Sequence, residues 1–330
     1  MKRRELILLL AGAMTAPHPL RAQQKAMPVI GFLNSQTQDS ETARLAAIWE
    51  GLKETRFIEG QNVAFEYRFA DGQNDRLPML ASELVRHQVS VILANTTPPA
   101  IAAKAATSTI PIVFALGVDP VELGLVASFN RPGANITGVA FLVNQLVGKR
   151  LELLCEAAPT ATSLGMLADP RNPNYEAETR DAHAAAAALG RILHVANTAT
   201  ENELDAAFSQ LVEQRVGALF VAPEANFRIW RQQIVALAMR HRLPSSYSSG
   251  DFVRAGGLMS YGPDQLDSYR QAGVYAGRIL KGEKAAEMPV VQPTKFEFVI
   301  NLKTAEALGI KILPPVLALA TEVIEGDAVS

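Results

Sequence analysis

Apolar runs typical of buried strands alternate with helical patterns along most of this chain. The run at 28–33 (PVIGFL) precedes a helical pattern at 41–55, and the alternation continues to a strand at 136–141. It begins again with a helix at 144–157 and reaches a short strand near Tyr247. Strands that alternate with helices form parallel sheets covered by helices on both faces. The sequence therefore predicts an α/β protein built from two units of similar size.

Apolar spacing predicts one further helix in each half of this pattern. The first runs from Val121 to Phe129 and the second from Phe227 to His241. The turn Arg131-Pro132-Gly133 follows the first of them and leads into the strand at 136–141. Each half therefore contains enough strands and helices for one covered sheet.

The stretch at 256–309 reads as a strand, a helix, an extended linker and another strand. Asp264 is a good N-cap for the helix, and Gly282 stands where a C-terminal glycine is expected. After a linker rich in proline, Phe296, Phe298 and Ile300 alternate with Lys295, Glu297 and Asn301, which predicts a strand with one buried face. Such a linker after a complete helix indicates that the chain passes from one folded body to another.

This stretch resembles the C-terminal signature of a family of ABC-transporter substrate-binding proteins with the type I periplasmic-binding fold. The matching words are SYG, YRQAGVYAGRILKGEKAAEMPV and QPTKFEFVINLKTAEALGI, and a looser likeness extends from 28 to about 325. The best-understood branch of the family binds tryptophan or tyrosine.

The resemblance implies two Rossmann-like lobes with parallel sheets, joined by a hinge of three chain segments. Lobe one is expected at 28–141 plus 262–290, and lobe two at 142–261 plus 291–325. The chain would therefore cross between the lobes three times at one edge.

Residues 1–22 have the features of a signal peptide. A basic start precedes an apolar run at 6–14, which is about half the length that a membrane span needs. Cleavage is expected near Ala22, and the Arg3-Arg4 pair hints at the twin-arginine route. No cysteine directly follows the apolar run, so we expect an exported periplasmic protein without a lipid anchor. A first helix of a cytosolic protein is the alternative.

Charge and motif content argue against several function classes. Removal of residues 1–22 leaves 27 of the 31 basic and 32 of the 33 acidic residues, a formal charge of −5, so a nucleic-acid surface is not expected. Cys155 is the single cysteine, which excludes an internal disulfide and a cysteine-based metal site. Phosphate-loop, zinc-protease and serine-hydrolase motifs are absent, and no histidine has a partner at metal spacing. We therefore expect no enzyme, no cofactor and no metal.

Polar residues follow the predicted strands of the first half, and ligands bind beyond the carboxyl ends of parallel strands. Asn34, Ser35, Thr96, Thr97 and Asp119 occupy these loops and are candidate ligand contacts. Thr96 and Thr97 precede two prolines that open a helix, and free N–H groups at such a helix start are a seat for a carboxylate. Simple capping is the alternative for these threonines and for Asp119.

Further candidate contacts come from the loops of the second half and from the crossings between the halves. They are Phe141, Asn172, Glu224, Asn226, Tyr247 and Asp264. Phe141 and Tyr247 would stack on a flat ligand, with core packing as the alternative. Asn172 would form a turn after a strand, with or without ligand contact. Asp264 is a cap or hinge residue, or it contacts the ligand.

The resemblance also implies a difference in the loop at 223–227. The aromatic-amino-acid branch carries an Asp just before an Asn in this loop, whereas this chain has Ala225 before Asn226. Glu224 would have to replace that carboxylate as the partner of a ligand ammonium. An aromatic or small carboxylic acid therefore remains open as the ligand beside an amino acid.

These observations predict a periplasmic solute-binding component of an ABC importer. It would close its hinge on one small ligand and present that ligand to an ABC permease in the inner membrane, and a monomer suits this mechanism. Two alternatives remain, a ligand-sensing receptor domain that partners a membrane signalling protein and an α/β enzyme that uses the cleft.

Overall fold

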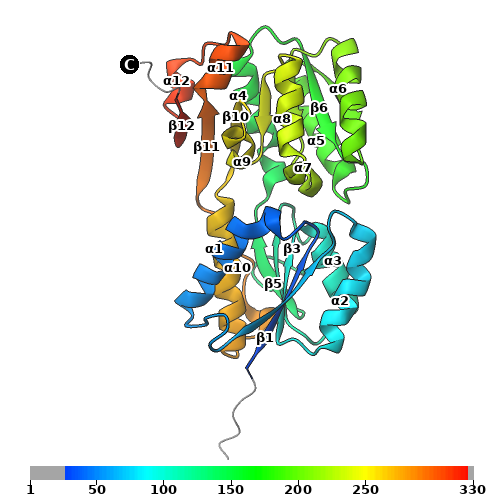
Figure 1. The fold of residues 1–330 in the computed structure, drawn as a ribbon, viewed down its shortest axis with the longest axis vertical. Coiled ribbons are helices and arrows are strands. Elements are labelled where there is room, and N and C mark those ends of the chain that lie inside the picture. Colours follow the sequence, from blue (N-terminus) through cyan, green and yellow to red (C-terminus); the bar gives the residue numbers. More distant parts are fainter. Residues whose placement is uncertain (1–26, 326–330) are drawn as a thin grey trace, which may run out of the picture.

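A computed structural model describes residues 27–325, which fold into two α/β lobes. Figure 1 shows the lobes stacked along the long axis, with strands β1 and β5 in one lobe and β6 and β11 in the other. The predicted fold class is confirmed. The signal peptide predicted at 1–22 lies outside the described residues. Among the residues that the structure describes, no helix combines the length and the apolar character that a membrane crossing requires.

The first lobe contains a sheet of five parallel strands in the order β2-β1-β3-β4-β5. All residues of β3, β4 and β5 are buried, as expected for the apolar runs of a sheet covered on both faces. The elements of this part of the chain are β1 (Val29–Asn34), η1 (Asp39–Glu41), α1 (Thr42–Glu54), β2 (Ala64–Phe69), η2 (Asn74–Arg76), α2 (Leu77–Arg86), β3 (Val91–Asn95), α3 (Thr97–Ala106), β4 (Ile112–Leu116) and β5 (Ile136–Ala140).

The second lobe contains a sheet of seven strands in the order β12-β11-β10-β9-β8-β6-β7. Only the β10–β11 pair is antiparallel among its described strands. The elements are η3 (Val143–Leu146), α4 (Val147–Ala157), β6 (Ser163–Ala168), α5 (Tyr175–Ala188), β7 (Ile192–Asn197), η4 (Glu201–Glu203), α6 (Leu204–Glu213), β8 (Ala218–Val221), α7 (Ala225–Ile229), α8 (Arg231–Arg240), β9 (Ser245–Tyr247), α9 (Gly250–Arg254), β10 (Met259–Pro263), β11 (Phe296–Asn301), α11 (Leu302–Leu308), α12 (Pro314–Leu317) and β12 (Glu322–Ile324).

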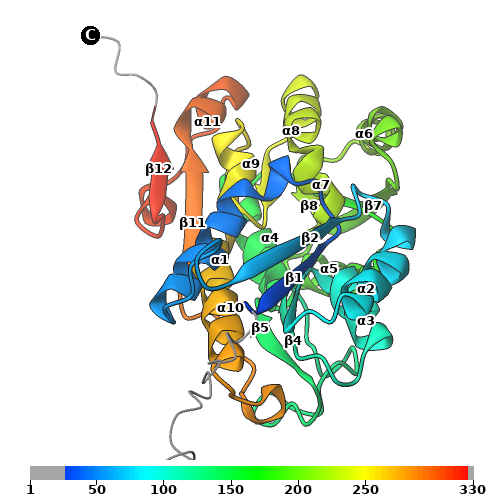
Figure 2. The same cartoon turned by 60° about the horizontal axis from the view of Figure 1, so that its bottom comes forward.

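Helix α10 (Gln265–Leu280) returns the chain to the first lobe, where it packs along α1 (Figures 1 and 2). Glycines allow the two helix backbones to approach closely. A Cβ atom at Gly273 would overlap the carbonyl of Ile48, and one at Gly51 would overlap the carbonyl of Arg270. The glycines of the signature stretch therefore fix the first lobe as a discontinuous unit.

The chain passes between the two sheets three times. It leaves the first sheet after β5, returns between β10 and α10, and leaves again through η5 (Ala285–Glu287) and an extended segment before β11. A parallel bridge between Val139 and Val291 holds two of these segments together. Strand β10 extends to Pro263, so the second sheet includes two residues beyond the lobe boundary expected at 262.

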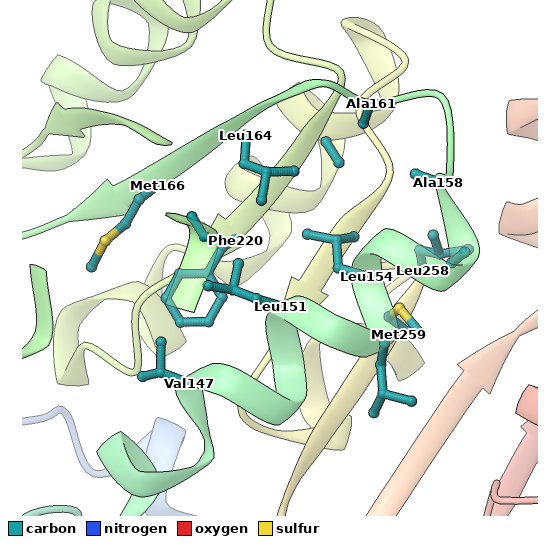
Figure 3. Close-up of a cluster of buried hydrophobic side chains, with 14 of the residues drawn as sticks. Val147, Leu151, Leu154, Ala158, Ala161, Leu164, Met166, Phe220, Leu258 and Met259 are labelled. Carbon is teal, nitrogen blue, oxygen red and sulfur yellow. The ribbon is translucent and has the colours of Figure 1, made fainter. Parts of the chain in front are cut away.

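A buried apolar cluster fixes α4 against the sheet of the second lobe (Figure 3). Val147 and Leu151 of α4 pack with Met166 of β6 and Phe220 of β8. These side chains are almost fully buried, and each contributes about 1.5–3 kcal/mol to folding. The cluster therefore sets the position of α4 and of its buried Arg150 within the second lobe.

Two of the predicted helices differ from the structure. Residues 121–129 form turns instead of a helix, because Gly124 adopts φ 64° and the Leu125 amide donates to the Pro120 carbonyl at 2.8 Å. The helix predicted at 227–241 is divided at Trp230 into α7 and α8. In the second case apolar spacing was correct about burial and wrong about the continuity of the helical backbone, whereas in the first case Val121 is 37% exposed.

Candidate ligand site

A cavity between the two lobes is lined by residues from both of them. The first lobe contributes the start of α3, the segment after β4 and Phe141. The second lobe contributes the segments after β6 and β8, together with residues of α5, α7 and α9. The carboxyl ends of strands from both sheets therefore meet at this cavity, which is where open α/β sheets bind their ligands.

Thr96 and Thr97 form the polar part of the first lobe's wall. Thr96 has φ 76° and ψ 167°, a backbone region that residues other than glycine rarely adopt and that occurs preferentially at functional sites. Its hydroxyl lies 3.2 Å from the hydroxyl of Ser35. The prediction of several free N–H groups at this helix start is wrong, since both following prolines lack one and the Ala100 amide donates to the Thr96 carbonyl at 3.3 Å. The Thr97 amide and the two hydroxyls are the donors that remain.

Aromatic rings form another part of the wall. Phe141 and Tyr269 meet edge to face with ring centroids 5.6 Å apart, and both line the cavity together with Phe252. Tyr247 stacks on Phe252 at 4.7 Å but belongs to the buried core of the second lobe. The flat surface that faces the cavity is therefore provided by Phe141, Tyr269 and Phe252.

The loops after β6 and β8 place carboxylates on the second lobe's wall. Asp169 accepts from Arg171 at 2.8 Å and 3.1 Å, so its charge is neutralised within its own turn. Glu224 accepts from the side-chain amide of Asn172 and from the Asp169 amide, and it has no cationic partner among the described residues. Burial raises the pKa of Glu224 well above its usual range, and the neighbouring Glu178 raises it further.

Glu178 of α5 is a second buried carboxyl that lines the cavity. Its Oε1 atom has no hydrogen-bond partner in the part of the chain that the structure describes. Burial raises its pKa, an effect that Arg150 of α4 partly offsets. Arg150 is fully buried over the ring of Phe220, and burial lowers its pKa to about 10. Its guanidinium donates to the Val143 carbonyl at 3.1 Å, while Nε and Nη1 have no hydrogen-bond partner within residues 27–325.

Ion pairs connect the two lobes beside the cavity. Glu41 of the first lobe accepts from Arg228 of α7 at 3.3 Å, and Arg44 of α1 donates to Asp251 of α9 at 2.8 Å. Burial alone would lower the pKa of Arg228, but Glu41, Tyr269 and Asp251 raise it. Arg228 also lines the cavity, so one side chain contacts the opposite lobe and the space for the ligand.

The structure brings six of the eleven candidate residues together around the cavity. These are Thr96, Thr97, Phe141, Asn172, Glu224 and Asn226. The other five are Asn34, Ser35, Asp119, Tyr247 and Asp264, which are not among the lining residues.

Most of the five residues outside the lining have identifiable structural contacts. Asn34 donates to Glu41 at 2.9 Å and so supports the carboxylate that contacts the second lobe, while Ser35 supports Thr96. Asp119 accepts from the Val121 amide at 2.7 Å and closes a turn. Asp264 accepts from the Asp267 amide at 2.9 Å and caps α10, as its position in the sequence predicts.

Sequence reasoning missed Glu178, Arg228, Phe252 and Tyr269 as lining residues. A signal was available for Glu178, because it lies four and eight residues before Ala182 and Ala186 on the buried face of α5. A carboxylate on an otherwise apolar helix face requires a partner or a function. The other three depend on how the lobes meet, which no local pattern specifies.

Comparison with known proteins assigns the chain to a family. A family model described as ABC transporter substrate binding protein matches residues 29–324. The chain belongs to this family. It is therefore the substrate-binding component of an ABC transporter and is not an enzyme. Within 27–325, no group of His, Cys, Asp and Glu side chains is arranged to hold a metal ion.

Several relatives of this substrate-binding protein share its whole architecture. It is 28% identical over 265 residues to the tyrosine-binding protein of Clostridioides difficile strain R20291, covering 80% of this chain and 76% of the relative. A conserved domain protein of Vibrio cholerae matches with a TM-score of 0.83 and 27% identity, over 90% of this chain and 99% of the other. An ABC domain from Streptococcus pneumonia in complex with L-Trp matches with a TM-score of 0.81 and 26% identity, over the same shares.

Proposed function

We propose that this substrate-binding protein takes up a small ligand that bears a carboxylate and an aromatic or flat body. The observation that carries the proposal is the composition of the interlobe cavity, in which Thr96 and Thr97 offer donors beside the rings of Phe141, Phe252 and Tyr269. Hydroxyl and amide donors at a helix start suit a carboxylate, and aromatic walls suit a ring. The relatives named for tyrosine and for L-Trp support the same ligand class.

Binding would work by hinge closure. Each lobe supplies part of the lining, so a ligand makes its full set of contacts only when the lobes are together and thereby favours the closed state. In this proposal lobe one comprises 28–141 plus 262–290, lobe two comprises 142–261 plus 291–325, and the three crossings form the hinge. The closed surface would then be presented to an ABC permease in the inner membrane.

The proposed location is the periplasm, after cleavage of a signal peptide near Ala22, in an unanchored and monomeric form. The basic and apolar pattern of residues 1–22 supports export. N-terminal sequencing of periplasmic material is expected to give a start near Gln23, and a start at Met1 would overturn the export proposal.

A thermal-shift series tests the ligand class. The probes are L-tyrosine, L-tryptophan and 3-(4-hydroxyphenyl)propionate, which all carry a ring and a carboxylate. We expect Tm to rise with probe concentration for at least one of them, because a ligand that binds only the folded state stabilises it by RT ln(1 + [L]/Kd). An unchanged Tm with all three would refute the proposed ligand class.

A further inference from the structure

A groove lies beside the ligand cavity, between helices α2 and α3 of the first lobe, which pack side by side (Figures 1 and 2). Leu77 and Pro78 of α2 form one side of this space, which we call the side groove. Ile101, Ala102 and Ala105 of α3 form the other side. The side groove has a volume of about 400 Å³, which is within the range of small-molecule sites.

The side groove and the ligand cavity share part of their walls. Asn74 and Pro98 line both spaces. The loop after β6 also serves both, since Asn172 and Asn174 line the cavity and Pro173 between them lines the groove. The two spaces therefore lie next to each other at the place where the two lobes meet.

One face of α3 leads from the ligand cavity into the side groove. Thr97 and Pro98 at the start of the helix line the cavity. Pro98, Ile101 and Ala105 follow one another at helical spacing and line the groove. Because Thr97 belongs to the proposed seat of the ligand's carboxylate, the groove begins next to that end of the ligand.

The walls of the side groove are apolar. Among the described residues that line it, only Asn74 and Ser82 have polar side chains, and none is charged. The Ser82 hydroxyl donates to the Pro78 carbonyl at 2.8 Å, so this bond is made within α2. Ile101 is 39% exposed and Ala105 is also exposed, so solvent reaches the groove. An apolar chain would cover this surface, whereas a charged group would find no oppositely charged partner on these walls.

We propose that the side groove is a second part of the ligand site and binds an apolar chain that the ligand carries near its carboxylate. The inference rests on the proposed function and extends it. The ligand class becomes a ring-bearing carboxylic acid with an apolar substituent of several carbons, such as an acylated aromatic amino acid. Pro173 belongs to the second lobe, so both lobes contact the chain and its binding also favours closure.

A series of N-acyl-L-tyrosines tests the chain. N-acetyl-, N-butanoyl- and N-hexanoyl-L-tyrosine share the ring and the carboxylate and differ only in the length of the apolar chain. Full burial of one methylene group raises affinity about fourfold, and partial burial in an open groove raises it less. We therefore expect a gain of about two- to fourfold per methylene by isothermal titration calorimetry, with a more negative heat capacity change for the longer chains. Affinity that stays constant or falls with chain length would overturn the inference, and the groove would then suit a protein partner instead.

Variants locate the chain in the side groove. Ala105→Leu fills the groove from an exposed position of α3, and Ser82→Asp places a charge on its α2 side. Each change is expected to reduce the gain between N-acetyl- and N-hexanoyl-L-tyrosine about tenfold and to leave affinity for N-acetyl-L-tyrosine within about twofold. Met79→Ala is the matched control, because Met79 is an exposed residue of α2 that is not among the lining residues. Full retention of the gain in both groove variants would show that the chain lies elsewhere and that the inference is wrong.

An apolar dye separates failure of the inference from failure of the proposed function. N-phenyl-1-naphthylamine carries no carboxylate, and we expect it to bind the wild-type protein with increased fluorescence and to bind Ala105→Leu at least about tenfold more weakly. No dye binding, or equal binding to the wild type and to Ala105→Leu, would refute the side groove as an apolar site. If the dye binds in the groove and all three N-acyl-L-tyrosines fail to bind, the proposed carboxylate ligand is wrong and the apolar site remains.

Discussion

Two groups of buried charge lie close together in this protein and differ in how they are paired. The junction group comprises Glu41, Arg44, Arg228 and Asp251, whose cations and anions meet across the two lobes at 2.8 Å and 3.3 Å. The cavity group comprises Glu178 and Glu224, which line the cavity, and Arg150, which lies outside the lining; all three belong to the second lobe and form no ion pair in the described residues.

The difference indicates what each group does. Paired charges that come from opposite lobes are satisfied only when the lobes meet, so the junction group favours closure. Buried carboxyls without an ion-pair partner in the described residues destabilise the lobe that carries them, which indicates that they serve a purpose other than stability. We therefore assign closure to the junction group and ligand selection to the cavity group.

The largest expected effect comes from Glu41→Gln. This change leaves the Arg228 guanidinium buried without its anionic partner in the closed state, at a cost of about 2–3 kcal/mol. Opening of the lobes would return Arg228 to water. We expect a larger radius of gyration by small-angle X-ray scattering without ligand, and affinity for L-tyrosine reduced about 30- to 100-fold because the closed state is less populated.

Glu54→Gln is the control for this variant. Glu54 ends the same helix α1 and pairs with Arg270 at 2.6 Å, but the pair is half exposed and lies within the first lobe. Exposed pairs contribute about 0–1 kcal/mol, so the radius of gyration is expected to stay unchanged. If Glu41→Gln and Glu54→Gln behave alike, the junction group does not control closure.

A smaller effect is expected on the opposite wall of the cavity. Thr96→Ala combined with Thr97→Ala removes the two hydroxyl donors of the first lobe and leaves Glu178 and Glu224 of the second lobe in place. Affinity for 3-(4-hydroxyphenyl)propionate is expected to fall about tenfold, and affinity for tyramine, which carries an amine and no carboxylate, to stay the same. A parallel loss for both probes would show that the walls do not divide the ligand's charges between them.

Arg150→Met tests whether the charge of Arg150 influences the titration of Glu178. The Arg150 charge lowers the pKa of Glu178, so its loss is expected to shift the pH midpoint of L-tyrosine binding upward by roughly half to one unit. Stability without ligand is expected to be equal or higher, because an apolar chain replaces a fully buried cation whose Nε and Nη1 lack partners. An unchanged midpoint would mean that Arg150 and Glu178 are not coupled.

The sheets of this fold can be predicted from the sequence more fully than the residues of its ligand site. Apolar runs such as those of β3 and β4 mark buried strands, and Asp264 marks the start of α10, because these signals are local. The helix predicted at 121–129 failed because local turn bonds at Gly124 outweighed apolar spacing. Arg228 and Tyr269 reach the cavity only after the chain has crossed between lobes, and spacing along the sequence does not encode that meeting.

The smallest expected effect concerns Asp251, the partly exposed residue of the junction group. Burial raises the pKa of Asp251, but Arg44 and Arg228 lower it more and hold it below its usual range. A carboxyl whose pKa is lower in the folded than in the unfolded protein stabilises the fold at pH values above its unfolded pKa. This stabilisation is lost only as the pH falls through the folded pKa. The Asp251 pair with Arg44 is therefore expected to stay intact from pH 8 to pH 5.

Asp251→Asn is expected to weaken L-tyrosine binding about two- to fivefold, since the Asp251 side chain is 40% exposed and Arg44 keeps its 3.2 Å contact with Gln265. The pH dependence of binding between pH 8 and pH 5 is expected to stay the same as in the wild type. Isothermal titration at several pH values provides both measurements. A changed pH profile would show that the two charge groups act as one network, and the separation of closure from ligand selection would fail.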